Sequence, residues 1–429
     1  MENVSIGLLG FGTVGSGVVH IINAHQDRLE HQLGCQVSIR KILVQDPTKP
    51  RKVDLKDAVL TQDVNDIIDD PTIDVVIEVM GSVEDTKDYV SRALRNKKHI
   101  LTANKDMMAL YGNELLQLAQ ENEVDFYYEA SVAGGIPIIR SLVEGLAPDR
   151  LTNLMGILNG TTNYILTKMS QEGRDYADVL KEAQSLGFAE ADPTSDVEGL
   201  DAARKLKILA SLGFSMDIDL ADVSVTGISN VTQNDLEFCH QLGYSMKLIA
   251  LANRDNGKVE VSVEPTLIPH EHPLAAVNNE FNAVYVNGEA IGELMFYGPG
   301  AGMLPTATAV VSDLMTVIKN MRLNVTGNSM TPPQYEKNLK TDDEVAAKYF
   351  VRLLAVDIPG TFAEVTTLFG QNDISLEKVL QLPVANEAHA EIVVTTYKTR
   401  KSNFNKVLQA LENSIAVKNI KSYYRIEGE

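Results

Sequence analysis

The first 130 residues alternate between short apolar runs and amphipathic stretches. Five apolar runs predict buried strands, over residues 4–9, 37–44, 73–79, 99–105 and 124–129. Helix-like stretches separate them, for example over 17–22 and 86–96. Strands that are apolar on both sides and alternate with helices are typical of a parallel sheet with helices on both faces. We therefore expect an α/β domain of the Rossmann type over residues 1–130, with ligands at the carboxyl ends of its strands.

The pattern changes in the middle of the chain. Strands of a second sheet are predicted over 156–158 and 282–287, with helices beside it over 176–186 and 200–212. This mixture indicates an α+β domain over residues 131–325, and the chain is free to return to the first domain near residues 300–325. We expect this middle domain to supply a substrate pocket and a subunit interface.

Residues 326–347 are polar and rich in turn formers, without apolar periodicity, which indicates a linker. Over residues 348–429 the order is strand, helix, strand, strand, helix, strand. The predicted strands span 349–355, 374–380, 388–396 and 420–426, and the predicted helices span 360–369 and 403–411. That order predicts a ferredoxin-like domain.

A glycine-rich loop follows the first predicted strand directly and precedes a helix-like run. Its residues are Gly10, Phe11, Gly12, Thr13, Val14 and Gly15. In this setting the first glycine permits a tight turn, the second lets the backbone approach a pyrophosphate, and the third allows the helix to pack closely on the strand. The loop therefore predicts a dinucleotide site.

The end of the second predicted strand bears on the choice between NAD and NADP. Asp46 follows that strand, where a carboxylate can accept hydrogen bonds from the adenosine ribose of NAD. Basic side chains that can hold the 2′-phosphate of NADP crowd the same place, namely Arg40, Lys41, Lys49, Arg51 and Lys52. The sequence leaves both cofactors open.

Composition narrows the classes of partner. Lys and Arg number 38 and Asp and Glu 58, a formal charge of −20, which repels nucleic acid and anionic membrane surfaces. Because we find neither a signal peptide nor an apolar stretch long enough to span a bilayer, we expect a cytoplasmic protein.

Cys35 and Cys239 are too few for a disulfide framework and lack metal-ligand spacing.

Two stretches carry candidate chemistry. Lys105 lies at the carboxyl end of the predicted strand 99–105, beside the expected nicotinamide. Residues 189–205 place five carboxylates, those of Glu190, Asp192, Asp196, Glu198 and Asp201, before Lys205. Asp201 and Lys205 are four positions apart and share a helix face, a spacing that also suits an ordinary stabilising ion pair.

Several motifs in series resemble the homoserine dehydrogenase family from about residue 4 to about residue 325. They are Gly10–Gly15, Thr102–Lys105, Glu129–Ile138, Gly156–Ile165, Gly187–Lys205 and Gly298–Gly302. The resemblance implies a reversible, NAD- or NADP-dependent interconversion of L-homoserine and L-aspartate 4-semialdehyde, on the route to threonine and methionine. Asp357–Gly360, between the first strand and first helix of the last domain, is similar to the ACT domain, a small regulatory module.

The resemblance to homoserine dehydrogenase also implies roles for individual residues. Lys205 is the expected acid and base, and Asp201 and Asp196 position it and the substrate. Glu190 is expected to accept hydrogen bonds from the substrate amino group, and Lys105 to hold its carboxylate or share the proton transfer. The remaining expected site residues are Gly160 and Thr161 in the substrate pocket and Gly302 in a loop at the cofactor.

Further expectations concern other ligands and assembly. The family resemblance implies a monovalent cation, sodium or potassium, at Glu129 and the backbone carbonyls of Val132, Gly134 and Ile136. Resemblance to ACT domains makes threonine a candidate effector and leaves a merely dimer-stabilising domain as the alternative. We expect a homodimer or homotetramer.

Rival functions differ at specific residues. A sugar or polyol dehydrogenase shares the first domain but usually has Glu-Lys-Pro where this chain has Asn104-Lys105-Asp106. An aspartate-semialdehyde dehydrogenase needs a nucleophilic cysteine, and neither cysteine lies in such a context. A non-catalytic NAD(P)-sensing regulator with an ACT domain binds cofactor without turnover. Because the first strand begins within a few residues of Met1, we expect no fused aspartate kinase.

Overall fold

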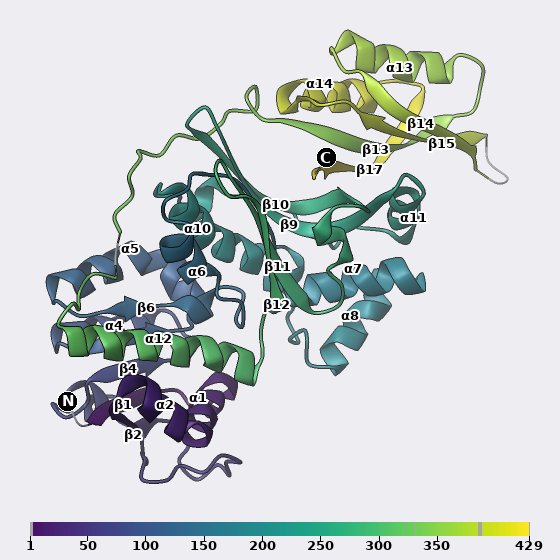
Figure 1. Ribbon diagram of the computed structural model, residues 1–429. Helices are drawn as coiled ribbons and strands as arrows, with labels where there is room; N and C mark the ends of the chain where they lie inside the picture. The colour runs from purple at the N-terminus through teal and green to yellow at the C-terminus, as the bar shows by residue number, and fades with distance from the viewer. Residues whose placement is uncertain (1–2, 330, 385–387, 429) are drawn as a thin grey trace. The chain divides into compact units, whose positions relative to one another are not determined.

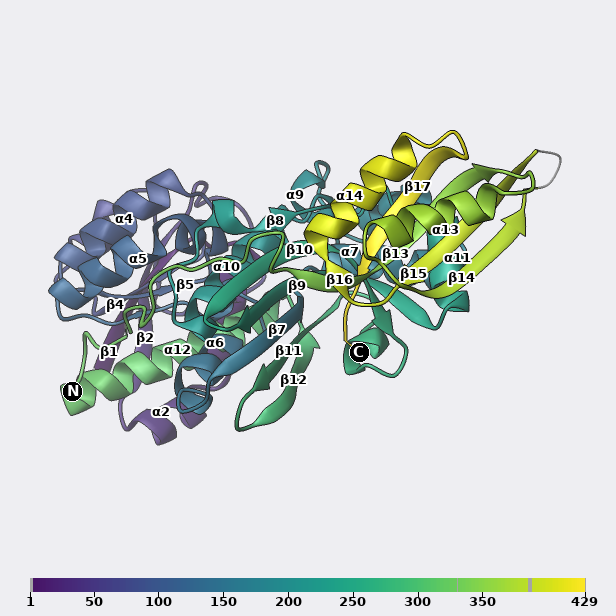
Figure 2. The same ribbon diagram turned by 90° about the horizontal axis from the view of Figure 1, so that it is seen from above.

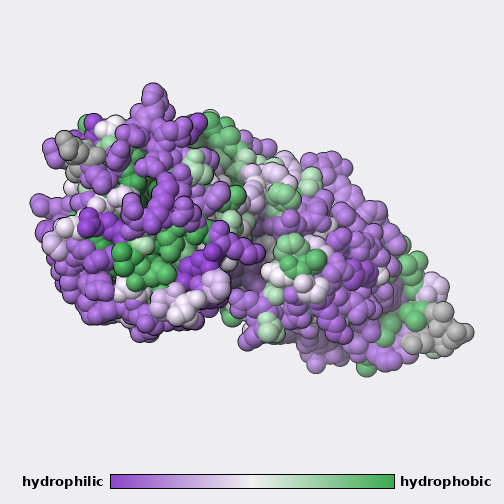
Figure 3. All heavy atoms as spheres, turned by 90° about the horizontal axis from the view of Figure 1, so that it is seen from below, coloured by the Kyte–Doolittle hydropathy of each residue, from purple (hydrophilic) through white to green (hydrophobic). Residues whose placement is uncertain are grey.

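The computed structural model describes residues 3–329, 331–384 and 388–428. The chain forms two compact units. The first comprises Met1–Leu151, Arg204–Asp222 and Asn282–Lys337, and the second comprises Thr152–Ala203, Val223–Phe281 and Asn338–Glu429. Hydrophilic residues cover most of the face drawn in Figure 3, in keeping with the formal charge of −20.

The first unit is built on a six-stranded sheet in the order β3-β2-β1-β4-β5-β6. Its strands are β1 (Asn3–Leu9), β2 (Gln36–Leu43), β3 (Val59–Thr61), β4 (Val75–Glu78), β5 (His99–Thr102) and β6 (Phe126–Tyr127). Every neighbouring pair is parallel. The predicted parallel α/β domain is therefore confirmed.

Helices cover both faces of this sheet. They include α1 (Thr13–Ala24), α2 (Gln26–Leu33), α3 (Asn65–Ile68), α4 (Glu84–Arg95), α5 (Lys105–Glu121) and α12 (Met303–Leu323). Figure 2 shows α4 and α5 on one face and α2 and α12 on the other. The first unit also holds the short helix α6 (Ile138–Arg140), the π-helical turn η2 (Ser141–Gly145) and the 3-10 turns η1 (Glu129–Ser131) and η3 (Leu220–Asp222).

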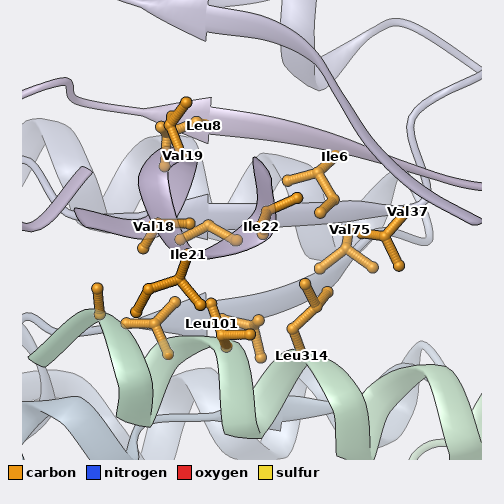
Figure 4. Packing of buried hydrophobic residues seen from close by; sticks show 14 of the residues in the cluster. Ile6, Leu8, Val18, Val19, Ile21, Ile22, Val37, Val75, Leu101 and Leu314 are labelled. Carbon is orange, nitrogen blue, oxygen red and sulfur yellow. The ribbon is translucent and has the colours of Figure 1, made fainter. Parts of the chain in front are cut away.

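Helix α12 completes the core of the first unit although it comes late in the chain. Leu314 packs with Ile6, Val75 and Leu101 of the sheet and with Ile21 of α1 (Figure 4). Burying such aliphatic side chains stabilises the fold by roughly 1.5–3 kcal/mol each. The contact between α1 and α12 is close, because a Cβ added to Gly17 would lie 2.4 Å from the carbonyl oxygen of Met303.

The second unit contains a mixed sheet in the order β7-β9-β10-β17-β13-β15-β14, with β8 on β10 and β16 on β13. Its first strands are β7 (Leu151–Ile157), β8 (Ser224–Val225), β9 (Tyr244–Asp255) and β10 (Lys258–Pro269). The helices are α7 (Gly160–Glu172), α8 (Tyr176–Ser185), α9 (Thr194–Val197), the first turn of α10 (Leu200–Phe214), α11 (Gln233–Gln241) and the 3-10 turn η4 (Pro273–Ala276). Strands β11 (Phe281–Gly288) and β12 (Gly292–Pro299) form a further hydrogen-bonded pair.

The C-terminal module has the predicted order of strands and helices. Its elements are β13 (Ala346–Val356), α13 (Thr361–Gln371), β14 (Leu376–Pro383), β15 (His389–Thr396), β16 (Thr399–Arg400), α14 (Lys401–Glu412) and β17 (Val417–Ile426). Helices α13 and α14 lie on one face of its strands (Figure 1). The short strand β16, which pairs with the start of β13, was not predicted.

The polar stretch before this module is not wholly irregular. The backbone N–H of Val259 donates to Asn338, and the backbone N–H of Lys340 donates back to Val259. Strand β13 already begins at Ala346. Backbone pairing does not depend on an apolar pattern, so the hydropathy of this stretch did not reveal it.

The C-terminal module is joined to the rest of the second unit by paired strands and buried charges. Strand β17 pairs with β10 in parallel through Thr266 and Arg425. The carboxylate of Asp235 on α11, 1% exposed, accepts hydrogen bonds from Arg352 of β13 at 2.9 Å and from Ser422 of β17 at 2.5 Å. Burial alone would raise the pKa of Asp235, but these and other hydrogen bonds outweigh it and leave that pKa below its usual value.

Candidate functional site

The glycine-rich loop has the geometry that dinucleotide binding requires. Gly10 adopts a φ of 102°, and a Cβ there would lie 2.9 Å from the carbonyl oxygen of Val79. A Cβ on Gly15 would lie 2.3 Å from the carbonyl oxygen of Gly10. At Gly12, the N-cap of α1, a Cβ would meet no atom within 4 Å, so this backbone is open to a ligand. The three glycines therefore have the geometry of a tight turn, an open backbone and a close packing point.

The acidic and the basic side chains after β2 lie in different surroundings. The carboxylate of Asp46 accepts hydrogen bonds from the backbone N–H of Thr48 at 2.8 Å and from its hydroxyl at 2.6 Å, which lower the pKa of Asp46. The guanidinium of Arg51 lies over the Phe11 ring, 5.5 Å from its centroid. Arg51 thereby places a positive charge beside the nucleotide loop.

Buried polar groups hold the carboxyl ends of β4 and β5. The carboxylate of Glu78, 0% exposed, accepts hydrogen bonds from the backbone N–H of Met80 at 2.7 Å and from the Thr102 hydroxyl at 2.5 Å. Asn104 caps α5 by accepting from Met107 at 3.0 Å, and its amide donates to Ser82 at 2.6 Å. Lys105 is consequently the first residue of a helix whose start is fixed. The sequence analysis did not identify Glu78, although a carboxylate that ends an apolar strand is an available signal.

An ion pair joins the segments that carry the two predicted catalytic lysines. The Oδ1 atom of Asp106, which follows Lys105, lies 3.0 Å from the Nε atom of Arg204. Arg204 directly precedes Lys205 on α10. The pair therefore ties the first turn of α5 to α10 within the first unit.

In the second unit, Asn159 brings two predicted carboxylates together. Its side-chain amide donates to Asp196 at 2.7 Å and to Asp201 at 2.9 Å, while its oxygen caps α7 by accepting from Thr162 at 2.9 Å. Asp201 is 2% exposed and lies in the first turn of α10. Sequence reasoning missed the role of Asn159, although an Asn at a strand-to-helix junction is a recognisable N-cap signal.

The other predicted substrate residues lie in different surroundings. The hydroxyl of Thr161, in the first turn of α7, donates to the carbonyl of Phe188 at 2.5 Å. A Cβ on Gly160 would lie 2.6 Å from the carbonyl oxygen of Glu280, so only glycine fits there without a shift. Glu190 is exposed and lies between α8 and α9.

The predicted cation ligand Glu129 is buried beside a second carboxylate. Glu129 accepts from the backbone N–H groups of Ile139 at 2.8 Å and Arg140 at 2.7 Å. The backbone N–H of Glu129 donates to Asp313 at 2.9 Å, and Asp313 also accepts from the Arg140 guanidinium at 2.8 Å. Burial raises the pKa of Glu129 and raises that of Asp313 to about 7.

The loop after Glu129 is sharply turned. Ala133 and Gly134 have φ values of 52° and 34°, and a Cβ on Gly134 would lie 2.5 Å from the carbonyl oxygen of Gly300. The carbonyl of Ile136 accepts the N–H of Ile138 at 2.8 Å. Gly302, with a φ of 128°, is the N-cap of α12.

The described residues lack a metal cluster and a membrane-spanning helix. Across residues 3–329, 331–384 and 388–428, no three His, Cys, Asp or Glu side chains gather as a metal cluster would require. Within the same described ranges, we find no helix whose length and apolarity would let it cross a bilayer. Both cysteines, Cys35 and Cys239, are buried as free thiols.

Comparison with known families matches nearly the whole chain. Residues 10–129 match the NAD-binding domain of homoserine dehydrogenase, residues 137–315 match the homoserine dehydrogenase model, and residues 349–416 match the ACT domain. The homoserine dehydrogenase of Bacillus subtilis (strain 168) is 61% identical over 429 residues, covering 100% of this chain and 99% of that protein.

Solved structures agree with these matches. A homoserine dehydrogenase from Thiobacillus denitrificans superposes with a TM-score of 0.93 at 36% identity, covering 100% of this chain and 99% of that one. A hyperthermophilic archaeal homoserine dehydrogenase in complex with NADPH superposes with a TM-score of 0.61 at 26% identity, covering 74% of this chain and 98% of that one.

The parallel sheet, the glycine loop and the polar groups at its strand ends define a nicotinamide-nucleotide-dependent oxidoreductase that acts on an alcohol. The chain belongs to the homoserine dehydrogenase family and carries a C-terminal ACT domain. It catalyses the reversible oxidation of L-homoserine to L-aspartate 4-semialdehyde, a reaction of amino-acid biosynthesis. The rival functions considered from the sequence are not favoured.

Two alanine substitutions in the glycine loop should affect different properties, the first stability and the second cofactor binding. Gly15→Ala should lower the free energy of unfolding by about 1–3 kcal/mol, because the new Cβ clashes with the backbone of Gly10. Gly12→Ala should leave stability near wild type and weaken NADPH binding on the order of 10-fold, because the methyl group occupies open space where the pyrophosphate approaches. Thermal unfolding and fluorescence titration with NADPH measure the two effects. Equal loss of stability in both variants would contradict this division.

Proposed function

We propose that Lys205 is the acid and base of this homoserine dehydrogenase. The proposal rests on the side chains that precede Lys205 at the start of α10. Asn159 holds Asp196 beside Asp201 in the first turn of this helix, and Lys205 follows one turn later. On this proposal Asp201 orients Lys205 through a hydrogen bond.

The substrate is held by groups of complementary charge. Lys105 binds the carboxylate of homoserine, and Glu190 and Asp196 accept hydrogen bonds from its ammonium group. Gly160 and Thr161 line the substrate pocket. The positions of Lys105 at the fixed start of α5 and of Asp196 in the Asn159 cluster support these roles.

In the oxidation of homoserine, Lys205 takes the proton of the substrate hydroxyl. A nicotinamide held at the loop Gly10–Gly15 would supply the hydride acceptor for the carbon that bears this hydroxyl, so that loss of the proton to Lys205 would leave a carbonyl. A lysine that works as a base near neutral pH needs desolvation or a second cation nearby. Lys105 provides such a cation.

Replacing Lys205 tests the assignment. Lys205→Ala should lower kcat by about 100- to 10,000-fold, because general acid–base catalysis typically contributes that much. The dissociation constant of NADPH and the thermal midpoint should stay near wild type. Lys181→Ala removes an exposed lysine on α8 and serves as the control. A near wild-type rate in Lys205→Ala would discard the role of Lys205.

We also propose that the cofactor is NADP. The carboxylate of Asp46 is engaged by Thr48. The guanidinium of Arg51 donates to the backbone carbonyls of Asp46, Pro47 and Lys49 and places its positive charge beside Phe11 at the nucleotide loop. A guanidinium recognises phosphate through paired hydrogen bonds. The ratio of initial rates with NADP and NAD at equal concentrations measures this preference.

We propose a monovalent cation, sodium or potassium, near Glu129. The family implies it, and its ligands would be Glu129 and the carbonyls of Val132, Gly134 and Ile136. The charges around Glu129 are suited to a bound cation. The buried carboxylates of Glu129 and Asp313 and the exposed carboxylate of Glu144 share one guanidinium, that of Arg140, which leaves negative charge in excess. The carbonyl of Ile136 already accepts one N–H, but a carbonyl oxygen has a second lone pair for a cation.

The excess charge predicts a stabilisation by salt that depends on pH. The pKa of Asp313 is raised to about 7, so protonation favours the folded state at low pH and this contribution is lost as pH rises through about 7. Potassium or sodium should therefore raise the thermal midpoint more at pH 8.5 than at pH 6. Choline chloride at equal ionic strength is the control. An equal effect of choline and potassium at both pH values would discard the cation.

For the ACT domain we propose regulation by threonine. Gly360 between β13 and α13 has a φ of 100°, and the adjacent Ile358 is 60% exposed, so the turn after β13 is accessible. Because β17 pairs with β10 and Asp235 bonds to two strands of the module, deletion of the module would expose a sheet edge and a buried carboxylate. The test therefore uses the full chain. Millimolar threonine should inhibit the wild type and inhibit Asp357→Ala less, and no inhibition of the wild type would discard the proposal.

Two further proposals concern assembly and location. We propose a homodimer or homotetramer, supported by the exposure of Met295 and Tyr297 on β12, at 40% and 54%. Sedimentation velocity measures the oligomeric state. We propose the cytoplasm as the location, which agrees with two free and buried thiols.

A further inference from the structure

Each partner of the Asp106–Arg204 ion pair is the neighbour in sequence of one lysine of the proposed proton-transfer site. Asp106 is the second residue of α5 and directly follows Lys105. Arg204 lies in α10 and directly precedes Lys205. The two partners are distant in sequence, so this contact exists only in the folded first unit.

The pair is a direct ion contact between α5 and α10. The Nε atom of Arg204 lies 3.0 Å from Oδ1 of Asp106, and the two side chains are 28% and 30% exposed. Exposed ion pairs contribute little because water screens them and both side chains lose freedom. This pair is mostly shielded, and its carboxylate belongs to a helix start that Asn104 caps.

A second contact fixes the same two segments further along. The amide of Asn113, two turns later on α5, donates to the carboxylate of Asp217 at 2.8 Å, shortly after the end of α10. Two contacts that advance together in sequence hold α5 and the α10 segment in one register. A shift of one segment along the other would break both contacts.

The local balance of charge gives the pair a second effect. Three cationic side chains lie on these two segments, those of Lys105, Arg204 and Lys205. Asp106, next to Lys105, adds a carboxylate that pairs with Arg204. The carboxylate of Asp201 lies one turn before Lys205 on the same helix. Removing Asp106 or Arg204 alone therefore changes the local charge in opposite directions.

We propose that Asp106 and Arg204 are positioning residues for proton transfer. The ion pair holds the turn of α10 that carries Lys205 against the first turn of α5 that carries Lys105. This inference rests on the proposed roles of Lys205 and Lys105. Neither partner reacts with the substrate, and both act through the lysines beside them.

The test uses Asp106→Asn, Arg204→Gln and the double variant in the full-length enzyme. Each single variant should lower kcat for homoserine oxidation on the order of 10- to 100-fold, because misplacing a catalytic group by about 1 Å costs that much. The dissociation constant of NADPH should remain unchanged. The double variant should be no slower than the slower single variant, because both substitutions remove one interaction.

The pH profile separates positioning from a general loss of structure. Homoserine oxidation needs a deprotonated base, so kcat rises with pH until this base is fully deprotonated. We call this rising part of the pH profile the acidic limb. Asp106→Asn removes a negative charge and should move this limb to lower pH. Arg204→Gln removes a positive charge and should move it to higher pH. Arg204→Lys keeps the charge and should recover part of kcat with a limb near wild type.

Glu114→Gln is the matched control. Glu114 lies on the same helix α5, but its ion pair of 2.8 Å joins Lys87 of α4. This variant should keep both kcat and the limb of the wild type. If Asp106→Asn fails to fold, Arg204→Gln and Arg204→Lys decide the question on their own.

The outcomes separate this inference from the function it rests on. Wild-type kcat and an unshifted limb in Asp106→Asn and Arg204→Gln, beside an inactive Lys205→Ala, would overturn the positioning role and keep Lys205 as the base. An active Lys205→Ala would overturn both. Limb shifts in the same direction for both single variants would also overturn the positioning role.

Discussion

The hydrogen bonds of the buried Glu78 carboxyl group are the interactions on which the cofactor edge of the first unit depends. Burial raises the pKa of Glu78 because it removes water from the carboxyl group. Such a group can be fully buried only where hydrogen bonds replace that water. Its partners, the backbone of Met80 and the hydroxyl of Thr102, lie at the ends of neighbouring strands. Glu78 thereby links the loop after β4 to the residues that lead into α5. The position of Lys105 follows from this link, and the ion pair of Asp106 extends it to α10.

The same principle recurs at the other polar positions of the protein. Asp313 is paired with Arg140 and bonded by the backbone of Glu129, and Asp235 is surrounded by Arg352 and Ser422. Each such group would be costly if left alone, so each demands one arrangement of its partners. In the second unit Asn159 does this for two carboxylates at once, because an amide can donate two hydrogen bonds and still accept one at a helix start.

Much of the fold and part of the site could be predicted from the sequence. The apolar strands and the glycine loop depend on local pattern, since a buried strand needs apolar residues wherever it packs and a tight turn needs glycine at Gly10. The strand β16 and the pairing of Lys340 with Val259 were not predicted, because backbone hydrogen bonds leave no apolar signal. The positions of Glu78 and Asn159 at strand ends were available signals, but their hydrogen-bond partners could not be predicted. Their partners are identified by distance in space, and a single sequence carries no record of that distance.

The sequence by itself determined the parallel sheet, the nucleotide loop, the order of elements in the C-terminal module and the family. These features are encoded in residue periodicity, in glycines that only certain backbones accept, and in motifs of fixed spacing. Only the tertiary structure decided that Arg204 meets Asp106, that Asn159 gathers Asp196 and Asp201, and that β17 extends the sheet of β10. Such contacts join residues that are far apart along the chain. They form only because burial of the apolar cores fixes helices and strands in one register, after which polar side chains must find the partners that lie within reach.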